Sequence, residues 1–493
     1  MRTDHADPSP RGPGQTVPAI GEFLVPIELL LATTAKVLCS AVFVSRRDPT
    51  EAFRNSAPSA LHANQLPDVL RRHARWHVGE RQVDIRLDID GTVASELVAA
   101  HRAVHPGFDA DWAGEERRLV ALASVTRSAQ YIPDQGCLII PPDGDRSLHF
   151  TPTPIARGPV PSAGWCGDIR PSTAVQAAID AAFADDAACH AAMLVVQRGA
   201  IVGERYAPEL GPDRPLESWS MGKSLMATLI GLLVGRDALA LDAPAPVAAW
   251  RRPGDPRGAI TLRHLLNMSS GLRFTGQDDL RADWRHGLPE HFLPYGEALD
   301  VFAFATERAG EHPPGTVGRY RNCDPLALAG IFHETVRAMG GNPLTWPQTE
   351  LFDRLGMHGL VQEPDRWGRF VCSGFNFGTA RDWARLGLLY LNEGRWQGER
   401  VLPEGWAAFA RTPAPAWAQR NYGAQFWLNS VGEFVLPADT FYMAGGGGQY
   451  VFMVPSADLV IVRMGHSRGW ATAKPKVNQA LQSILAALPQ GAA

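Results

Sequence analysis

The chain is poor in cysteine and lacks the common metal-ligand motifs. Its 493 residues include six cysteines, which are too few for a disulfide scaffold of this size. The 15 histidines are scattered, and neither a C-x-x-C pair nor a His-Glu-x-x-His motif occurs. The usual spacings of zinc ligands are therefore missing. We expect no metal ion and no cofactor, and the cysteine content leaves the cellular compartment open.

A strong charge of either sign is also missing. The 47 basic and 51 acidic residues leave a formal net charge of −4. This balance argues against a nucleic-acid partner and against an anionic membrane surface, so a small or neutral substrate fits better. An apolar content of 45% is enough for a sizeable core. The length indicates a large catalytic domain with an addition.

The N-terminal region lacks an unbroken apolar run that could span a membrane. Residues 23–44 are mostly apolar, but Pro26, Glu28 and Lys36 interrupt them. A span needs about 20 predominantly apolar residues, so we expect no stable membrane span. A secretory signal cleaved near residues 32–35 and a buried helix or strand are both open interpretations of this segment. We favour an extracytoplasmic location, periplasmic or secreted, over a cytoplasmic one.

Proline and glycine concentrate at the expected domain boundary. Residues 141–165 hold six prolines and three glycines, a composition that breaks both helices and strands. We therefore predict a disordered tail over residues 1–18 and an N-terminal extension over 19–165 that ends in this proline-rich linker. The main domain then covers residues 166–493. The extension shows no catalytic motif, and its role is unknown.

The extension is expected to be small and partly β over about residues 40–140. Residues 83–89 alternate apolar and polar side chains, and Asp90-Gly91 follows them. This pattern is typical of a β-hairpin with a tight turn. Cys39 and Cys137 flank strand-like runs at 41–44 and 138–140. The two cysteines fit either one disulfide or two separate buried thiols.

The chemically distinctive stretch is Ser220-Met-Gly-Lys223, an S-x-x-K that leads into an apolar helix. Residues three apart share one face of a helix, so the Lys223 amine lies next to the Ser220 hydroxyl. A desolvated lysine has a lowered pKa and can accept the serine proton. The free backbone N–H groups at a helix start also favour an oxyanion. An isolated S-x-x-K is more often a solvated helix turn than an active site. The motifs that follow it in the sequence decide between these two interpretations.

Four further motifs follow in order. They are residues 262–271, Tyr320-Arg-Asn322, residues 379–386 and the glycine run 445–449. Their order and spacing resemble the beta-lactamase-related serine hydrolases, which include class C beta-lactamases, D-alanyl-D-alanine carboxypeptidases, esterases and 6-aminohexanoate-dimer hydrolases. The resemblance covers about residues 170–490. It implies an α/β fold of the α+β type, the beta-lactamase-like fold, in which an antiparallel sheet is flanked by helices beside a helical region.

The resemblance also implies roles for single residues. Ser220 would be the acylated nucleophile, and Lys223 with Tyr320 would form the proton-transfer pair. Asn322 would hold Lys223 and the substrate carbonyl by hydrogen bonds. Tyr320 acts as a base only if a cation such as Lys223 lowers its phenol pKa. Without catalysis, Tyr320 would be a packed aromatic residue and Asn322 a helix cap.

The glycine run is where this chain departs from the family pattern. The N–H groups of Ser220 and Gln449 would form the oxyanion hole, with Gly448 allowing close approach of the substrate. Many relatives carry Lys-Thr-Gly or a histidine variant where this chain has four glycines at 445–448. The cation that would hold a substrate carboxylate is absent. We expect catalysis to survive and recognition of anionic substrates to suffer; a flexible turn is the alternative reading of the run.

These observations favour hydrolysis of an ester or amide through a Ser220 acyl-enzyme. The substrate would be a small ester, amide or peptide-like molecule. A beta-lactamase or D-alanyl-D-alanine carboxypeptidase is one alternative, and the missing cation disfavours it. A non-catalytic recognition module with the same fold is another, and the presence of Ser220, Lys223 and Tyr320 speaks against it. The sequence leaves the natural substrate and the oligomeric state open.

Overall fold

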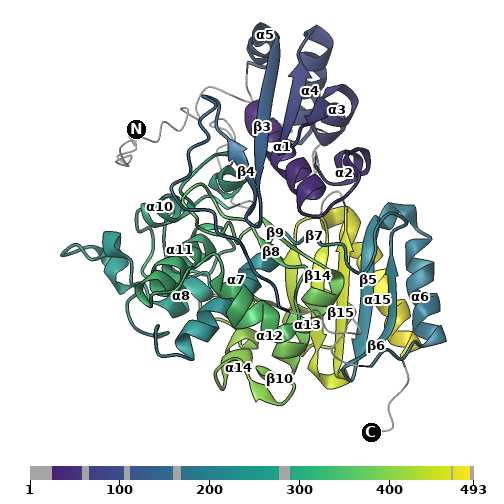
Figure 1. Cartoon of the computed structure of the whole chain (residues 1–493), viewed down its shortest axis with the longest axis vertical. Helices are drawn as coiled ribbons and strands as arrows, with labels where there is room; N and C mark the ends of the chain where they lie inside the picture. Colours follow the sequence, from purple (N-terminus) through teal and green to yellow (C-terminus); the bar gives the residue numbers. More distant parts are fainter. Residues whose placement is uncertain are drawn as a thin grey trace.

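The computed structural model describes residues 25–57, 66–104, 111–158, 168–276, 289–467 and 470–488. The expected tail over 1–18 lies outside these residues. Figure 1 shows a large main body below a smaller N-terminal part, drawn in purple and blue. The main body consists of a sheet with helices on both faces and a helical region beside it. The fold expected for the main domain and the partly β extension are therefore confirmed.

The main sheet has six antiparallel strands in the order β12-β13-β14-β15-β5-β6. The strands are β5 (His190–Gln197), β6 (Ala200–Tyr206), β12 (Trp427–Leu428), β13 (Phe441–Gly445), β14 (Gln449–Val454) and β15 (Leu459–Gly465). The hairpin of β5 and β6 turns at Arg198 and Gly199, whose φ angles of 51° and 75° suit a tight hairpin turn. Since β15 pairs with β5, the two ends of the domain share one sheet.

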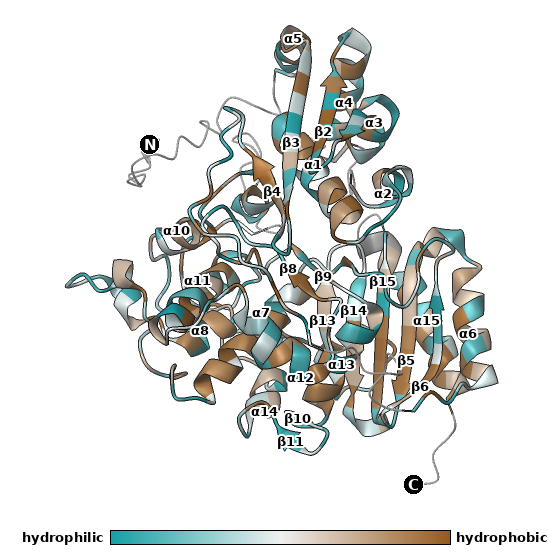
Figure 2. Cartoon of the chain, in the orientation of Figure 1, coloured by the Kyte–Doolittle hydropathy of each residue, from teal (hydrophilic) through white to brown (hydrophobic). Residues whose placement is uncertain are grey.

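Helices cover both faces of this sheet, and its central strands are therefore apolar on both sides. Figure 2 shows β5 and β15 as mostly apolar along their length. Side chains alternate along a strand, so Met193 and Val195 pack in the core beneath α6 (Thr173–Phe183) and α15 (Trp470–Ala487). Leu194 and Val196 belong to the larger core, which includes α7 (Met221–Val234) and α13 (Ala380–Leu391).

Local capping signals set several helix starts. Thr261 opens α8 (Leu262–Leu266) and Thr379 opens α13, each through a reciprocal capping box. The longer helix α11 (Cys323–Ala338) begins directly after Asn322. The remaining elements of the main domain are short: α9 (Leu293–Gly296), α10 (Val301–Thr306), α12 (Asp353–Leu355), α14 (Trp406–Arg411), β7 (Leu216–Glu217), β8 (Val361–Gln362), β9 (Asn376–Gly378), β10 (Arg395–Trp396) and β11 (Glu399–Arg400).

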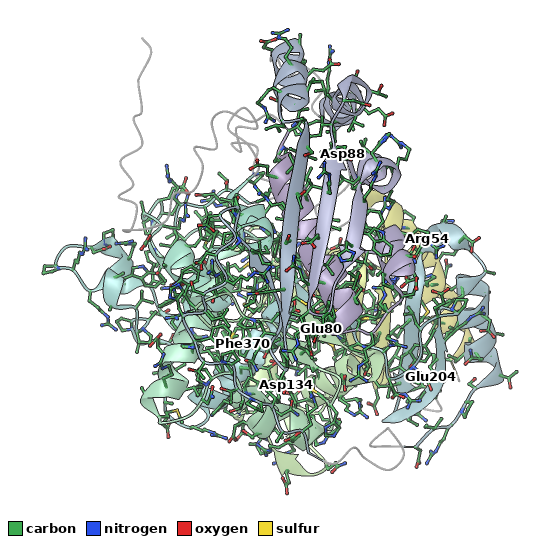
Figure 3. All side chains as sticks on the ribbon, turned by 45° about the horizontal axis from the view of Figure 1, so that its top comes forward. Arg54, Glu80, Asp88, Asp134, Glu204 and Phe370 are labelled. Atoms are coloured by element: carbon green, nitrogen blue, oxygen red, sulfur yellow. The ribbon has the colours of Figure 1, made fainter. Side chains whose placement is uncertain are left out.

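The N-terminal part is a four-stranded antiparallel sheet with helices around it. Its strands are β1 (Arg75–Val78), β2 (Gln82–Asp88), β3 (Ser124–Ile132) and β4 (Gly136–Ile140), in that order across the sheet. Its helices are α1 (Ile27–Phe43), α2 (Pro49–Asn55), α3 (Leu66–His73), α4 (Gly91–Val104) and α5 (Trp112–Ala121). Asp88 lies at the outer end of this sheet, whereas the β3–β4 turn with Asp134 reaches the main domain (Figure 3).

Two expectations for the N-terminal part are wrong. The hairpin predicted at Asp90-Gly91 is the start of α4, because the Asp90 carboxylate accepts the Val93 N–H at 2.9 Å and caps a helix. The strand-like run at 41–44 belongs to the end of α1 and the turn after it. Cys39 and Cys137 are both free and buried, so the interpretation as separate thiols holds.

Residues 27–43 form a helix that is buried between the N-terminal sheet and the main domain. α1 contacts β2, β3 and β4 on one side and α9 on the other. In the part of the chain that the structure describes, no helix has the length and apolar character needed to cross a membrane. Residues 141–158 contain no helix or strand; the domain boundary expected here stays a prediction. They are nevertheless held to the main domain, since the His149 N–H donates to Arg366 O at 2.8 Å.

Candidate active site

The S-x-x-K motif lies at the start of α7, as predicted. Ser220 directly precedes the helix, and its side chain makes no capping hydrogen bond. Lys223 Nζ donates to Ser220 Oγ at 2.7 Å. Lys223 is only 1% exposed, whereas Ser220 is partly exposed. A buried amine therefore contacts a hydroxyl that a substrate can reach.

The burial of Lys223 changes its basicity. Loss of hydration disfavours the charged amine and lowers the pKa of Lys223 to about 7. The amine is then close to half protonated at neutral pH. A base with a pKa near the working pH is the most effective at accepting a proton, so the pair can generate a nucleophile on Ser220.

The backbone around Ser220 is shaped by close packing. Trp219 has a φ of 48°, a left-handed conformation that is uncommon for a bulky residue. A Cβ added to Gly222 would lie 2.5 Å from Cys372 O and 1.9 Å from Asn376 Nδ2. Only glycine therefore allows the first turn of α7 to pack against the segment 372–376. This contact explains the third position of the motif.

The Ser373 carbonyl is a part of the site that sequence reasoning missed. Ser373 O accepts a hydrogen bond from the Tyr295 hydroxyl at 2.9 Å and lies 3.3 Å from Ser220 Oγ and 3.4 Å from Lys223 Nζ. Burial raises the pKa of Tyr295, so its hydroxyl stays protonated and donates. A backbone carbonyl has no side-chain signature, so no sequence signal could have identified it.

Tyr320 lies beside Lys223, as the resemblance implies. Lys223 Nζ is 4.8 Å from the centroid of the Tyr320 ring. The partly exposed Tyr320 also packs on Trp427, with ring centroids 5.2 Å apart, and edge-on against Tyr422 at 6.1 Å. The position suits a partner of Lys223; the proton-transfer role itself stays a prediction.

Asn322 is fully buried and bonds to different partners from those expected. Its amide nitrogen donates to His291 O at 2.7 Å and to the Tyr295 hydroxyl at 2.8 Å. A bond to Lys223 is not among the hydrogen bonds of the described residues, and the side chain does not cap α11. Asn322 therefore reaches the site through the Tyr295 hydroxyl and the Ser373 carbonyl. Its Oδ1 has no partner among the described residues.

The glycine run forms the turn between β13 and β14, next to the nucleophile. Gly445 pairs with Gln449 across the turn, and Gly447 and Gly448 have φ angles of 79° and 80°. A Cβ on Gly445 would lie 2.0 Å from Ser218 O. Glycine is thus required for close approach at 445 and for left-handed backbone at 447 and 448.

The side chain of Gln449 does not point to an exposed site. It is 1% exposed, and its Oε1 accepts the Gly465 N–H at 2.9 Å. Within Gln449, only the backbone N–H is therefore left as a proposed oxyanion donor, together with the N–H of Ser220. That role, like the substrate contact of Gly448, stays a prediction.

Arg463 holds the glycine turn through hydrogen bonds, and sequence reasoning missed this residue too. The guanidinium donates to Gly447 O at 2.9 Å, to Gly448 O at 2.7 Å and to the Ser467 hydroxyl at 2.9 Å. Arg463 is 1% exposed, and burial lowers its pKa to about 10. A signal did exist, because an arginine inside the otherwise apolar run of β15 must have a specific partner.

The N-terminal part contacts the segment that leads to Ser220. Arg47, which follows α1, donates to Glu217 at 3.1 Å, and Glu217 Oε1 lies 3.5 Å from His466. Burial, the largest single effect, would raise the pKa of Glu217, but the Arg47 charge together with contacts from His466 and Ser56 outweighs it and lowers the pKa to about 2. The ionised carboxylate ties the N-terminal part to the strand that precedes the nucleophile.

Two nearby arginines are already engaged. Arg319 donates to Glu311 at 2.5 Å. Arg321 is 1% exposed, donates to Leu272 O at 2.7 Å and lies 3.7 Å from Asp324. Within the described residues, no group of three or more His, Cys, Asp or Glu side chains is arranged to hold a metal ion.

Comparisons with known proteins identify the family of this chain. The sequence matches the model of the Beta-lactamase family over residues 175–486. The 6-aminohexanoate-dimer hydrolase of Paenarthrobacter ureafaciens is 25% identical over 306 residues, which cover 56% of this chain and 72% of the relative. A penicillin-binding protein homolog from Caulobacter crescentus has a similar solved structure, with a TM-score of 0.52 and 18% identity, covering 65% of this chain and 99% of the homolog. Because the family model matches more than half of its length, the chain belongs to the beta-lactamase family of serine hydrolases.

Proposed function

We propose that this protein hydrolyses a small, neutral ester or amide through an acyl-enzyme on Ser220. The observation that carries the proposal is the 2.7 Å contact between the buried Lys223 amine and the Ser220 hydroxyl. With its pKa lowered to about 7, the neutral amine accepts the hydroxyl proton. The Ser220 oxygen then bonds to the substrate carbonyl carbon, and the carbonyl electrons move to its oxygen.

The protein is proposed to complete the reaction with groups that lie next to this pair. The N–H groups of Ser220 and Gln449 stabilise the oxyanion, and the Arg463 guanidinium holds the turn before Gln449 in place. When the intermediate collapses, the proton passes from Lys223, with Tyr320 beside it, to the departing alcohol or amine. Water then attacks the acyl carbon and gives a proton to Lys223. The proton passes to the Ser220 oxygen as the acid is released.

A neutral substrate is supported by the charges near Ser220. The glycine run has no cation, and the guanidinium groups of Arg319 and Arg321 are bound to acids and a carbonyl. Trp219, Tyr320 and Trp427 are partly exposed aromatic residues close to the pair, and such side chains suit an uncharged body. The name of the curated relative, 6-aminohexanoate-dimer hydrolase, supports a small-molecule substrate. A beta-lactamase or carboxypeptidase activity has less support because its anionic substrates lack a partner here.

The test is covalent trapping at Ser220. Wild-type protein is mixed with a short-chain nitrophenyl ester, and intact mass spectrometry should show one added acyl group that maps to Ser220. Ser220→Ala should lose the adduct and several orders of magnitude in turnover, while exposed Ser483→Ala should behave as wild type. Equal turnover by Ser220→Ala and wild type in matched preparations would remove Ser220 from the mechanism.

A further inference from the structure

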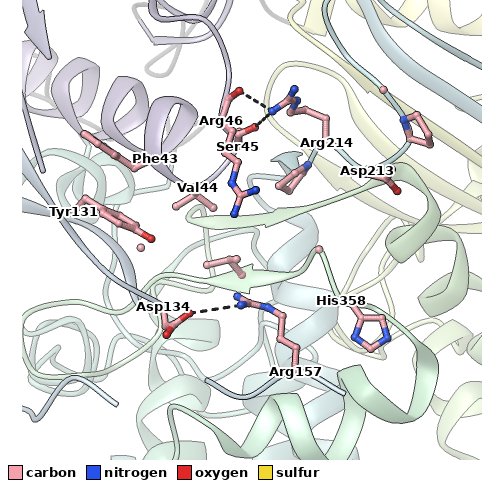
Figure 4. Close-up of a pocket in the computed structure, with 16 residues that line it drawn as sticks. Phe43, Val44, Ser45, Arg46, Tyr131, Asp134, Arg157, Asp213, Arg214 and His358 are labelled. Atoms are coloured by element: carbon pink, nitrogen blue, oxygen red, sulfur yellow. Dashed lines mark hydrogen bonds and ion pairs between the residues drawn. The ribbon is translucent and has the colours of Figure 1, made fainter. Parts of the chain in front are cut away.

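A cavity of about 580 Å³ lies between the N-terminal part and the main domain (Figure 4). None of the active-site residues described above lines it. Its walls come from the end of α1 and the three residues after it, the β3–β4 turn, Arg157, the segment 211–215 before β7, and residues 358–361 at the start of β8. Small-molecule sites commonly have volumes of about 300–1,000 Å³ and form where two structural units meet.

The cavity lining includes three arginines. Arg157 lies 3.5 Å from Asp134, and Arg214 donates to Ser45 O at 3.0 Å and to Arg46 O at 2.6 Å. The Arg46 side chain is exposed and extends into the cavity (Figure 4). The structure shows no hydrogen bond or ion pair from the Arg46 guanidinium to any described residue. Arg46 is therefore the cation that is free to take a ligand.

Other polar groups in the wall also lack partners. Ser45 is fully buried, and its hydroxyl makes no hydrogen bond with the described residues. The same is true of both ring nitrogens of His358, whose side chain is 10% exposed and whose Nδ1 lies 3.8 Å from Asp353 Oδ1. Unpaired buried polar groups are rare in native proteins and indicate a missing ligand or water. Arg46 also has a φ of 54°, and such uncommon backbone conformations cluster at ligand sites.

Another part of the cavity lining is apolar. Phe43 and Tyr131 stack with ring centroids 5.2 Å apart and an interplanar angle of 12°. Val44 and Val361 extend this surface. The cavity lining therefore combines apolar side chains with cationic ones, which suits an amphipathic anion.

We propose that this cavity binds a small organic carboxylate, with an aromatic or acyl body against Phe43 and Tyr131 and its carboxylate on Arg46 and Arg157. A guanidinium matches a carboxylate through two parallel hydrogen bonds. Asp134 and Asp213 also line the cavity, so three arginines face two acids and one positive charge is left over. That balance selects a monoanion over a phosphate dianion.

The test is isothermal titration of the full-length Ser220→Ala protein with 4-phenylbutyrate. We expect one bound equivalent. Arg46→Gly should weaken binding by about tenfold or more, the usual cost of losing a charge-assisted hydrogen bond. Glycine is suited to the left-handed backbone at this position, so the variant should keep its fold, as a thermal melt can verify. Arg157→Gln should also weaken binding.

Three controls make the result decisive. Arg198→Gly removes another exposed arginine with a left-handed φ, of 51°, and should leave binding unchanged. The neutral 4-phenylbutan-1-ol and inorganic phosphate should each bind at least about tenfold more weakly than the carboxylate. Absence of binding at millimolar ligand, unchanged affinity in Arg46→Gly, or equal loss in Arg198→Gly would each overturn the proposal. Tighter binding of phosphate would assign the cavity to a simple oxyanion instead.

Discussion

At the scale of single residues, the environment of Lys223 determines the proposed chemistry. In water a lysine amine is almost fully protonated at pH 7 and cannot take the proton of Ser220. Burial on the inner side of α7 removes the hydration that favours the charged amine. The Ser373 carbonyl oxygen, which is uncharged, accepts a hydrogen bond from the amine at 3.4 Å.

The lowered pKa of Lys223 predicts how activity depends on pH. Only the neutral amine accepts a proton, so kcat/KM should rise as pH increases through about 7. The measurement is kcat/KM for a nitrophenyl ester over the pH range in which the protein stays folded. Lys223→Arg should be inactive at every pH because its guanidinium stays protonated, whereas Lys474→Arg on the surface should keep the wild-type profile. A rate that does not change from about pH 6 to 9 would contradict the assignment.

At the scale of elements, the proposed preference for a neutral substrate depends on the turn between β13 and β14. Three of its glycines cannot be replaced without a clash or a strained backbone. Gly446 is different, because its φ is not in the left-handed region and an added Cβ would lie 3.5 Å from the nearest atom of Trp219, an ordinary contact. A side chain at 446 therefore has room next to the residue that precedes Ser220.

Gly446→Lys should shift preference toward anionic substrates. A new charge-assisted contact to a carboxylate typically contributes about 1.5–3 kcal/mol. The ratio of kcat/KM for benzylpenicillin to that for a neutral ester should therefore rise by about ten- to a hundredfold. Gly91→Lys, at an open position in the N-terminal part, is the matched control and should not change the ratio. If wild-type protein already handled both substrates equally, the proposal of a neutral substrate would be wrong.

At the scale of the whole molecule, α1 joins the N-terminal part to the hydrolase domain through a buried ion pair. Lys36 on α1 contacts Glu363 just after β8, and their side chains are 2% and 0% exposed. The Ser40 hydroxyl and the Cys137 N–H also donate to the Glu363 carboxylate, at 2.8 Å and 2.7 Å. Burial raises the pKa of Glu363, and Lys36 opposes that shift. The pair is thus a shared polar centre of both parts.

Lys36→Met should destabilise the protein strongly, because it leaves a buried carboxylate without its cation. Such losses cost about 3–5 kcal/mol. The double variant Lys36→Met/Glu363→Gln should recover part of this loss, and the coupling is measured by chemical unfolding of both single variants and the double variant. Arg205→Met at the exposed pair with Asp180 should change stability by less than about 1 kcal/mol. Additive losses at Lys36 and Glu363 would show that the two side chains do not act as a pair.

Local sequence was sufficient for the elements that carry the proposed nucleophile and its base. The spacing of Ser220 and Lys223 predicts their contact because three residues span less than one helical turn. The capping box at Thr379 is local in the same way, since it fixes the start of α13 through contacts within one helical turn. Asp90-Gly91 shows the limit of such reasoning, since the same two residues suit both a hairpin turn and a helix start. The structure has a helix there, which packs Val93 and Leu97 in the core.

Sequence by itself thus determined the family, the fold of the main domain and the Ser220–Lys223 pair, because those signals lie within one turn of helix or in the order of short motifs. Only the tertiary structure decided the burial that lowers the pKa of Lys223, the Ser373 carbonyl, the partners of Asn322 and the support from Arg463. It also decided that α1 is a buried helix at the junction of the two parts. These features depend on contacts between distant segments, such as Lys36 with Glu363, 327 residues apart, and Arg463 with Ala188, 275 apart. Contacts of that range are formed when the chain packs, and no local pattern of residues encodes them.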